Sequence, residues 1–393
     1  MFGRMMNNYY YGKSGKGDFR KDDMPETRMQ LFWDTLRTRL SALFRLNLLY
    51  MLVWIPAMLV ILLNFSNLWN RLQTETAISE YEYSEYVEML KNGNMEINIS
   101  EEDYNAVRAA LQEQQKIQGD RDYDAYLSRT SEEGGTPLTA EQFQAVRTSG
   151  ATDLQNKALI MLLILFPCIA ITGPFTAGLS YVTRNWARDE HAFIWSDFKD
   201  AVKANWKIPL LLSTITGALP MLIFQAWITY GNMAAGNALM VVPQMLVVMV
   251  GVLWALAITY MHPLTVTYEL KVRGVLRNGF LLGIARLPFS IGIRLLHCVP
   301  ALIAAGAVWF FGLDPLMAIM ILCGYYMLIG FSLSRFITAS YTNAVFDRFI
   351  NARIEGAKTN QGLRPKEDDD FDDEGEEAED QKPDEKTNDG GES

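Results

Sequence analysis

The chain has few of the side chains from which catalytic and metal-binding sites are built. It contains three cysteines and three histidines among 393 residues, and residues 65–157 contain neither type. Cys168, Cys298 and Cys323 lie in apolar runs at spacings that match no metal-binding motif, which is typical of buried small side chains. No serine–histidine–acid or cysteine–histidine arrangement stands out. We therefore predict that the chain is not an enzyme and uses no catalytic residue, cofactor or metal ion.

Three further absences restrict the function. The first 45 residues lack the short apolar core and the cleavage site of a secretory signal. Gly12-Lys13-Ser14 resembles part of a phosphate-binding loop, but Asn7 stands where that motif needs its first glycine. Basic residues do not form the surface that nucleic acid requires. Nucleotide and nucleic-acid binding are therefore not expected.

Six apolar runs dominate what is present. Each is near the 20 residues that a helix needs to cross about 30 Å of hydrocarbon. The runs lie at 46–64, 158–182, 208–230, 238–261, 289–311 and 315–337. They predict an all-α fold, a polytopic membrane helix bundle of about six transmembrane helices in a lipid bilayer. None of the runs contains Asp or Glu, which argues against a carrier that holds protons or sodium with carboxylates, although backbone carbonyls also bind sodium.

The polar segments divide the rest of the chain. Residues 1–24 are predicted to be a disordered cytoplasmic N-terminus, and apolar residues at helical spacing predict an amphipathic interfacial helix at 25–45. Residues 65–157 predict a small extracytoplasmic insert of two to four short helices, with capping signals near Ser100 and Thr139. Residues 356–393 predict an acidic disordered tail, because Glu367 to Ser393 contains 15 acidic residues and two lysines.

Lysines and arginines gather in every second connection, which sets the orientation. They are Arg184, Arg188, Lys199, Lys203 and Lys207 after the second run, Lys271, Arg273, Arg277 and Arg286 after the fourth, and Arg335, Arg348 and Arg353, which we assign to the segment after the sixth. Residues 231–237 carry no charge, and 311–315 carry only Asp314. We expect a multi-pass protein with both termini in the cytoplasm. Cleavage between Arg71 and Arg147 by external protease, with the acidic tail protected, tests this orientation.

The second run contains the sharpest local feature, Gly173-Pro174. Proline inside a helix frees backbone groups and predicts a kink or an unwound turn. Gly173 and Ala177 also form a small-residue pair that permits close approach of another helix. Two interpretations stay open: close packing with a kink, or an interrupted helix that presents backbone groups to a substrate.

A few polar side chains in or beside the runs are candidates for contact with a solute. On one continuous helix, Arg286 and His297 would lie about 20° apart and Arg294 about 80° from Arg286, whereas a break at Pro288 would change that register. This group predicts either a basic wall for an anionic or hydroxyl-rich ligand or cations that reach the membrane interface. Gln225 and Gln244 are either interhelical hydrogen-bond partners or ligand contacts. The loop residues 189–191 with Asp197 indicate a solvated face rather than a metal site.

Three stretches resemble the YesL-like family of bacterial integral membrane proteins, a family without an established activity. They are GPFTAGLSYVTRNWARDEHAFIWSDFKDAVKANWK at 173–207, NLLYMLVWIP at 47–56 and YMHPLTVTYELKVRGVLRNGFLLGIARLP at 260–288. The family-motif positions are Gly173, Pro174, Thr176, Gly178, Asp197, Phe198, Asn205 and Trp206. The insert at 65–157 and the acidic tail depart from the family pattern. The resemblance implies a protein of the bacterial cytoplasmic membrane that is associated with carbohydrate uptake.

Two functions are expected on these grounds. The first is an accessory or scaffold component linked to carbohydrate uptake or cell-envelope processes, with a transporter or a membrane sensor as its partner. The alternative is a carrier for a small polar or anionic solute such as a sugar. A membrane enzyme has the least support. A cavity that reaches Arg294 would favour the carrier, and a solid bundle would favour the scaffold.

Overall fold

A computed structural model describes residues 24–93, 99–234 and 236–364. Helices and their connecting turns account for the secondary structure of these residues, and no β-strand occurs among them. Disorder is predicted for residues 1–24, and all of these except residue 24 lie outside the described part. The same holds for the acidic tail beyond Arg364.

Six helical units are long and apolar enough to cross a membrane. They are α2 (Arg28–Glu80), α6 (Ala140–Trp186), α8 (Lys207–Ala234), η2 with α9 (Ala238–Met240 and Val241–Thr267), α11 (Leu287–Phe311), and α12, η3 and α13 in succession (Pro315–Tyr325, Tyr326–Gly330 and Phe331–Phe349). Each contains one of the six apolar runs, so the predicted all-α bundle of six spans is confirmed. The chain is a multi-pass membrane protein.

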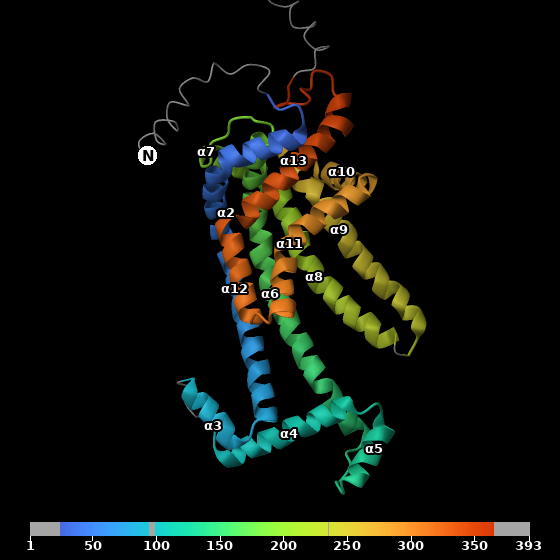
Figure 1. Cartoon of the computed structure of the whole chain (residues 1–393). Coiled ribbons are helices and arrows are strands. Elements are labelled where there is room, and N and C mark those ends of the chain that lie inside the picture. The colour runs from blue at the N-terminus through green and yellow to red at the C-terminus, as the bar shows by residue number, and fades with distance from the viewer. Residues whose placement is uncertain (1–23, 94–98, 235, 365–393) are drawn as a thin grey trace, which may run out of the picture.

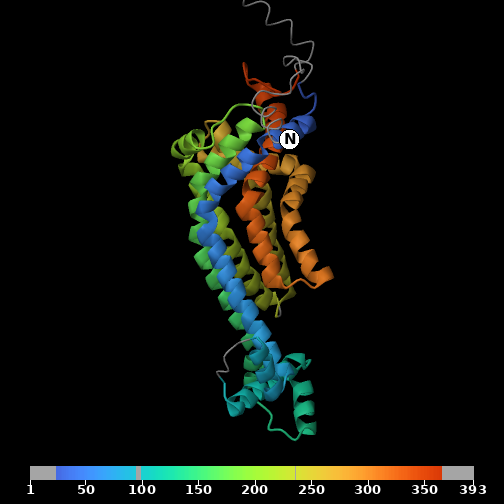
Figure 2. The ribbon, with the colours of Figure 1, turned by 60° about the vertical axis from the view of Figure 1, so that its left-hand side comes forward.

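The long helices α2 and α6 form the axis of the molecule. They pack against each other and run from one end of the bundle into the insert (Figure 1). The α8–α9 hairpin packs on α6 at the end of the bundle that is far from the insert. Toward the insert, the hairpin diverges from α6 (Figure 1). In a second hairpin, α11–α12, helix α12 packs on α2 and α11 packs on α9 (Figure 2). The bundle is therefore wider at the end that is nearer the insert.

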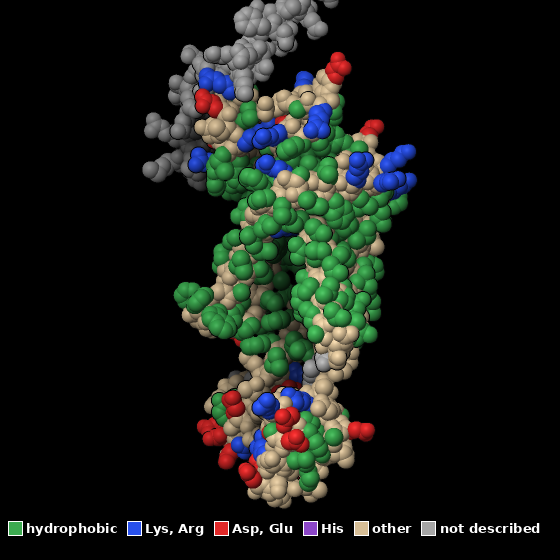
Figure 3. All heavy atoms as spheres, turned by 90° about the vertical axis from the view of Figure 1, so that its right-hand side faces the viewer, with side chains coloured by type: hydrophobic (Ala, Val, Ile, Leu, Met, Phe, Trp, Pro, Cys, Tyr) green, Lys and Arg blue, Asp and Glu red, His purple; other side chains and the backbone are tan. Residues whose placement is uncertain are grey.

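The surface of the bundle is apolar along the spans and basic at one end. Figure 3 shows a continuous belt of hydrophobic side chains, with Lys and Arg gathered above it at what we call the basic end. Trp309, Phe310 and Phe311 at the far end of α11 are 84%, 79% and 86% exposed. Aromatic side chains at that level are typical of a membrane interface.

The predicted amphipathic helix is the first part of α2 rather than a separate element. Thr27 and Gln30 form a capping box at its start. The Thr27 hydroxyl accepts from the Gln30 backbone N–H, and the Gln30 side-chain oxygen accepts from the Thr27 backbone N–H. This part crosses the basic end before α2 turns into the membrane span (Figure 1). Phe32 stacks on Phe336 of α13 at 5.2 Å, so its apolar face packs against the bundle as well as facing lipid.

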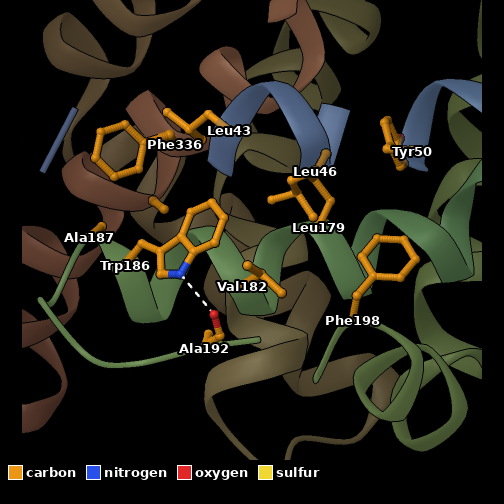
Figure 4. Close-up of a cluster of buried hydrophobic side chains, with 11 residues drawn as sticks. Leu43, Leu46, Tyr50, Leu179, Val182, Trp186, Ala187, Ala192, Phe198 and Phe336 are labelled. Carbon is orange, nitrogen blue, oxygen red and sulfur yellow. Dashed lines mark hydrogen bonds between the residues drawn. The ribbon is translucent and has the colours of Figure 1, made fainter. Parts of the chain in front are cut away.

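A compact apolar cluster holds the basic end together. Leu43 and Leu46 of α2 meet Leu179 and Trp186 of α6, and all four are almost fully buried (Figure 4). The Trp186 indole N–H donates to the Ala192 carbonyl at 3.2 Å, which fixes the loop after α6 (Figure 4). This cluster joins the first, second and sixth spans.

The insert contains three short helices between the ends of α2 and α6. They are α3 (Tyr83–Asn92), α4 (Glu101–Gly119) and α5 (Tyr123–Glu132). The predicted caps are confirmed: Ser100 accepts from the Asp103 N–H, and Thr139 and Gln142 form a full capping box. Because α2 extends to Glu80 and α6 begins at Ala140, the insert is built directly on two of the spans.

Two small aromatic clusters and one arginine stabilise the insert. Tyr104 packs among Ile78 and Tyr86, and Tyr126 packs against Phe143 at 5.0 Å. Arg129 donates to Asp120 and Glu113 and thereby joins α5 to α4. These hydrogen bonds raise the pKa of Arg129 above its usual value, so it stays charged. The insert is therefore a folded unit despite its polar sequence.

Helices α6 and α8 make their closest approach at Gly173. A Cβ atom added there would lie 2.3 Å from the Pro209 carbonyl oxygen and 2.8 Å from Leu210 Cα. The predicted close approach is confirmed. An unwound turn at Gly173-Pro174 is wrong, because α6 is helical without a break from Ala140 to Trp186.

Substitution of Gly173 by alanine is expected to destabilise the protein, because the added methyl group meets backbone that cannot move aside as a side chain does. Overpacking of this kind costs about 1–3 kcal/mol. Thermal unfolding of the purified protein in detergent measures the effect. Gly292→Ala on α11 is the control, since its Cβ would meet nothing within 4 Å. Equal melting temperatures for the two variants would contradict the proposed contact.

Candidate functional site

A cavity of about 300 Å³ lies inside the bundle, and all six spans contribute to its lining. Basic groups, hydroxyl groups and aromatic rings form most of its walls, and Ile169 and Ile258 complete the lining. A hollow is also visible in the apolar belt between the two halves of the bundle (Figure 3). The bundle is therefore not solid, which is the condition that favours a carrier over a scaffold.

The basic wall combines Arg294 and His297 of α11 with Arg335 of α13 and His262 of α9. No Asp or Glu lines the cavity. Among the described residues neither arginine forms an ion pair, and Arg294 Nε and His262 Nδ1 are buried without a hydrogen-bond partner. A charged group inside a bundle normally pairs with an opposite charge or with backbone carbonyls. The cavity thus carries an uncompensated positive charge.

His297 is fixed in position by the sixth span. Its Nε2 lies 3.1 Å from the Ser334 carbonyl oxygen and 3.3 Å from the Thr338 hydroxyl. A carbonyl oxygen only accepts, so Nε2 is the nitrogen that carries the proton in this contact. Residues Phe331, Ser334, Arg335 and Thr338 recur at helical spacing, so one face of α13 supplies both the basic group and its neighbours.

The hydroxyl wall comes from α6, α8 and α9. Thr172, Thr176, Ser213, Thr216 and Thr259 line it. The Thr176 hydroxyl donates to the Thr172 carbonyl at 2.9 Å and lies 2.7 Å from the Tyr50 hydroxyl. Since the single Thr176 proton is already used, Tyr50 is the donor in their contact. Tyr50 thereby joins the first span to the second inside the cavity.

The aromatic wall is formed by Tyr50 and Trp54 of α2 and by Tyr326 and Phe331 of the sixth span. Trp54 stacks on Phe331 with ring centroids 4.8 Å apart, and Tyr50 meets the same ring edge-on at 5.5 Å. Tyr326 meets Phe331 at 5.1 Å. The rings pack on one another and give this side of the cavity a fixed apolar surface.

A π-helical turn, η3 at Tyr326–Gly330, interrupts the sixth span beside the cavity. Asn47 of α2 is fully buried there. Its side-chain amide donates to the carbonyls of Tyr326 and Met327 at 2.9 and 2.8 Å, and its oxygen accepts from the Ser332 N–H at 2.9 Å. A π-turn adds one residue to the helix and rotates the residues after it, and such turns are frequent at functional sites. Asn47 therefore sets the register that directs Arg335 into the cavity.

Residues 154–226 match a family described as a protein of unknown function, DUF624. The matched segment spans the end of the insert, the second span and most of the third. It includes four of the five hydroxyl-wall residues, Thr172, Thr176, Ser213 and Thr216. Comparisons with curated proteins and with solved structures found no match.

The family-motif positions from Gly178 to Trp206 lie at the basic end of the bundle and not in the cavity. Gly178 admits α7 (Ser196–Asn205), since a Cβ there would lie 2.8 Å from the Phe198 carbonyl oxygen. Asp197 accepts from the Phe193 N–H at 2.9 Å and closes the loop before α7. Asn205 donates to the Ala201 carbonyl, and Trp206 is 45% exposed beside Lys207. These residues form a cap over the basic end of the second span. Of the eight family-motif positions, Thr176 is the one that lines the cavity.

Of the five side chains predicted to contact a solute, two lie in the cavity lining and three lie outside it. Arg294 and His297 line the cavity, and Arg294 does so instead of extending to the membrane interface. Arg286 does not, because the helix breaks there: α10 (Val272–Ala285) ends, α11 begins at Leu287, and the Arg286 guanidinium lies 4.2 Å from the Phe289 ring centre. Of the two alternatives for Arg286, the continuous helix is therefore wrong and the break next to Pro288 is confirmed.

Gln225 and Gln244 lie outside the cavity lining. Gln244 donates to the Trp227 carbonyl at 3.2 Å and joins α9 to α8, so it is an interhelical partner. Gln225 is exposed on α8. In the loop after α6, Glu190 pairs with Arg188 at 3.4 Å and His191 packs edge-on against Phe193. Among the described residues no three His, Cys, Asp or Glu side chains converge there.

Sequence reasoning misses Arg335 and His262. It assigns Arg335 to the basic segment after the sixth run, although this residue lies within 315–337. A charged residue inside an apolar run is a signal for a functional position, and here it contributes only to the predicted orientation. His262 comes directly after the fourth run, whereas α9 continues to Thr267 and buries it.

Replacement of Asn47 by alanine is expected to disturb the cavity rather than only the fold, since three backbone groups of the sixth span lose their side-chain partner. Each unsatisfied group costs about 1–3 kcal/mol. Hydrogen exchange should rise at Tyr326–Ser332, and cysteine-reactive probes placed at Ser334 should report altered access. Asn64→Ala is the matched control, because Asn64 on the same helix bonds only to the Val60 carbonyl of its own turn. Equal exchange in both variants would refute the role of Asn47.

Proposed function

We propose that this chain is a YesL-like protein of the bacterial cytoplasmic membrane whose central cavity binds a small anionic solute and carries it across the bilayer. The observation that supports this is the pair Arg294 and Arg335, which face one cavity that no carboxylate lines. The proposal adopts the carrier alternative that the sequence left open. It also places both termini in the cytoplasm and the insert outside.

The electrostatics of the cavity support an anion as ligand. A guanidinium removed from water loses several kcal/mol of solvation, and an opposite charge offsets much of that loss. Guanidinium groups also form paired, charge-assisted hydrogen bonds with carboxylate and phosphate oxygens. Arginine cannot release its proton at physiological pH, so a bound anion is the way in which this charge is compensated.

The make-up of the cavity supports transport rather than simple binding. All six spans line it, and the α8–α9 hairpin diverges from α6 toward one end of the bundle (Figure 1). Carriers commonly alternate access to a shared site by moving one group of helices against another, and here the site lies in the part of the spans nearer the basic end. With no acidic side chain in the lining, a coupling proton or sodium ion has no carboxylate site in this cavity.

An accessory role linked to carbohydrate uptake or cell-envelope processes is the second candidate, and the insert favours it. Helices α2 and α6 continue from the cavity into the insert without a break. A transporter or sensor subunit that binds the insert would therefore be mechanically connected to Tyr50 and Thr176. In this case the cavity would sense a solute without moving it.

The charge of Arg335 provides the test. The purified protein in lipid nanodiscs should bind a small anion such as gluconate, and Arg335→Gln should weaken that binding about 30-fold or more, as truncation of a buried charge partner does. Isothermal titration measures the affinity, and uptake into proteoliposomes measures transport. Arg294→Gln should act in the same direction.

Arg348→Gln is the control, since Arg348 is an exposed residue on α13 outside the cavity. Binding without uptake would favour the accessory role. If gluconate, phosphate and acetate all fail to bind the native protein, both candidate functions of the cavity are wrong.

A further inference from the structure

The hydroxyl wall presents acceptors to the cavity. The Thr172 hydroxyl donates to the Ile169 carbonyl at 2.7 Å, and the Thr259 hydroxyl donates to the Ala255 carbonyl at 3.4 Å. A threonine hydroxyl has one proton and two lone pairs, so a hydroxyl whose proton is used within its own helix still accepts. The Tyr50 oxygen is in the same state, because its proton goes to Thr176.

The basic wall presents the opposite chemistry. Arg294 and Arg335 offer only donors. Phosphate and carboxylate groups match them, because both are acceptors. A halide or a fully deprotonated inorganic anion, however, has no donors for the three hydroxyl oxygens in the lining. Those oxygens would then lose water without gaining a partner, which costs affinity.

The aromatic wall adds a third requirement. Trp54 and Phe331 are stacked, and Tyr50 fixes the second ring from the side. Rigid rings in the wall of a cavity contact the C–H surface of a ligand and leave its polar atoms to the polar side chains of the lining. A cavity of about 300 Å³ is at the small end of the range for molecules with a carbon skeleton.

We propose that the ligand is a polyhydroxylated anion, which means a small sugar acid or a sugar phosphate, and that Thr172 and Thr259 select for its hydroxyl groups. The inference rests on the proposed anion-binding function and specifies the substrate class of the same cavity. The anionic group lies at Arg294 and Arg335, the hydroxyl groups donate to the threonine oxygens, and the C–H face packs on the aromatic rings.

A comparison of matched ligands tests the substrate class. Gluconate and hexanoate have the same carbon number and the same single charge but differ in hydroxyl groups. The native protein should bind gluconate at least tenfold more tightly than hexanoate, since each hydroxyl hydrogen bond contributes about fivefold. The affinity of glucose 6-phosphate compared with that of gluconate shows whether the site prefers a phosphate or a carboxylate. The affinity of glucose shows what the hydroxyl groups contribute without the charge.

Threonine-to-valine variants assign the selectivity to its residues. Thr172→Val and Thr259→Val keep the side-chain shape and remove the oxygen, so the preference for gluconate should fall about fivefold in each while hexanoate binding stays unchanged. Thr183→Val is the control, because Thr183 is a buried residue on α6 with the same type of intrahelical bond and does not line the cavity.

The outcomes separate this inference from the function on which it rests. Equal affinity for gluconate and hexanoate, both lost in Arg335→Gln, would leave anion binding intact and overturn the hydroxyl selection. Unchanged selectivity in both threonine variants would also overturn it. Failure of every anion to bind would instead refute the function itself. Glucose that binds as tightly as gluconate would contradict the anionic part of the class.

Discussion

The cost of holding a charge inside a membrane bundle is the constraint on which the structure depends. Arg294 and Arg335 face one cavity, and among the described residues neither pairs with a carboxylate. Histidine side chains and threonine hydroxyls line the same cavity, and the Ser334 carbonyl contacts His297 rather than a guanidinium. Compensation of the charge is left for a ligand, because fixed donors in a cavity of low dielectric constant attract an anion strongly.

Two backbone devices make this arrangement fit. Gly173 lets α6 and α8, which both supply hydroxyl-wall residues, approach until a Cβ would overlap the Pro209 carbonyl. Asn47 holds the π-turn open in the sixth span and completes the hydrogen bonding of a helix that would otherwise expose carbonyls to hydrocarbon. The first device brings helices together and the second changes the register of a helix. Both lie within the spans, where lipid offers the backbone no alternative partners.

Sequence reasoning located the elements more accurately than the site. The six runs, the caps at Ser100 and Thr139 and the close approach at Gly173 depend on local composition, and all are confirmed. The cavity depends on register, which local composition does not determine. A π-turn rotates Arg335 by about 100° relative to a regular helix, and the break at Arg286 removes that residue from the face that Arg294 and His297 share.

The same difference explains why the DUF624 segment carries two kinds of residue. Phe198, Gly178 and Trp186 build a cap at the basic end, whereas Thr172 and Thr216 line the cavity. Only the three-dimensional arrangement separates the two groups. A sequence motif of this kind therefore indicates a fold first and a function second.

The central claim is that an anion compensates the two arginines. Crystals of the native protein soaked in selenate or bromide test it directly through anomalous scattering. The account predicts an anomalous peak within hydrogen-bond distance of both Arg294 and Arg335, and its loss in Arg335→Gln. A native protein in which a carboxylate side chain of the chain itself occupies the position between the two guanidiniums would contradict it.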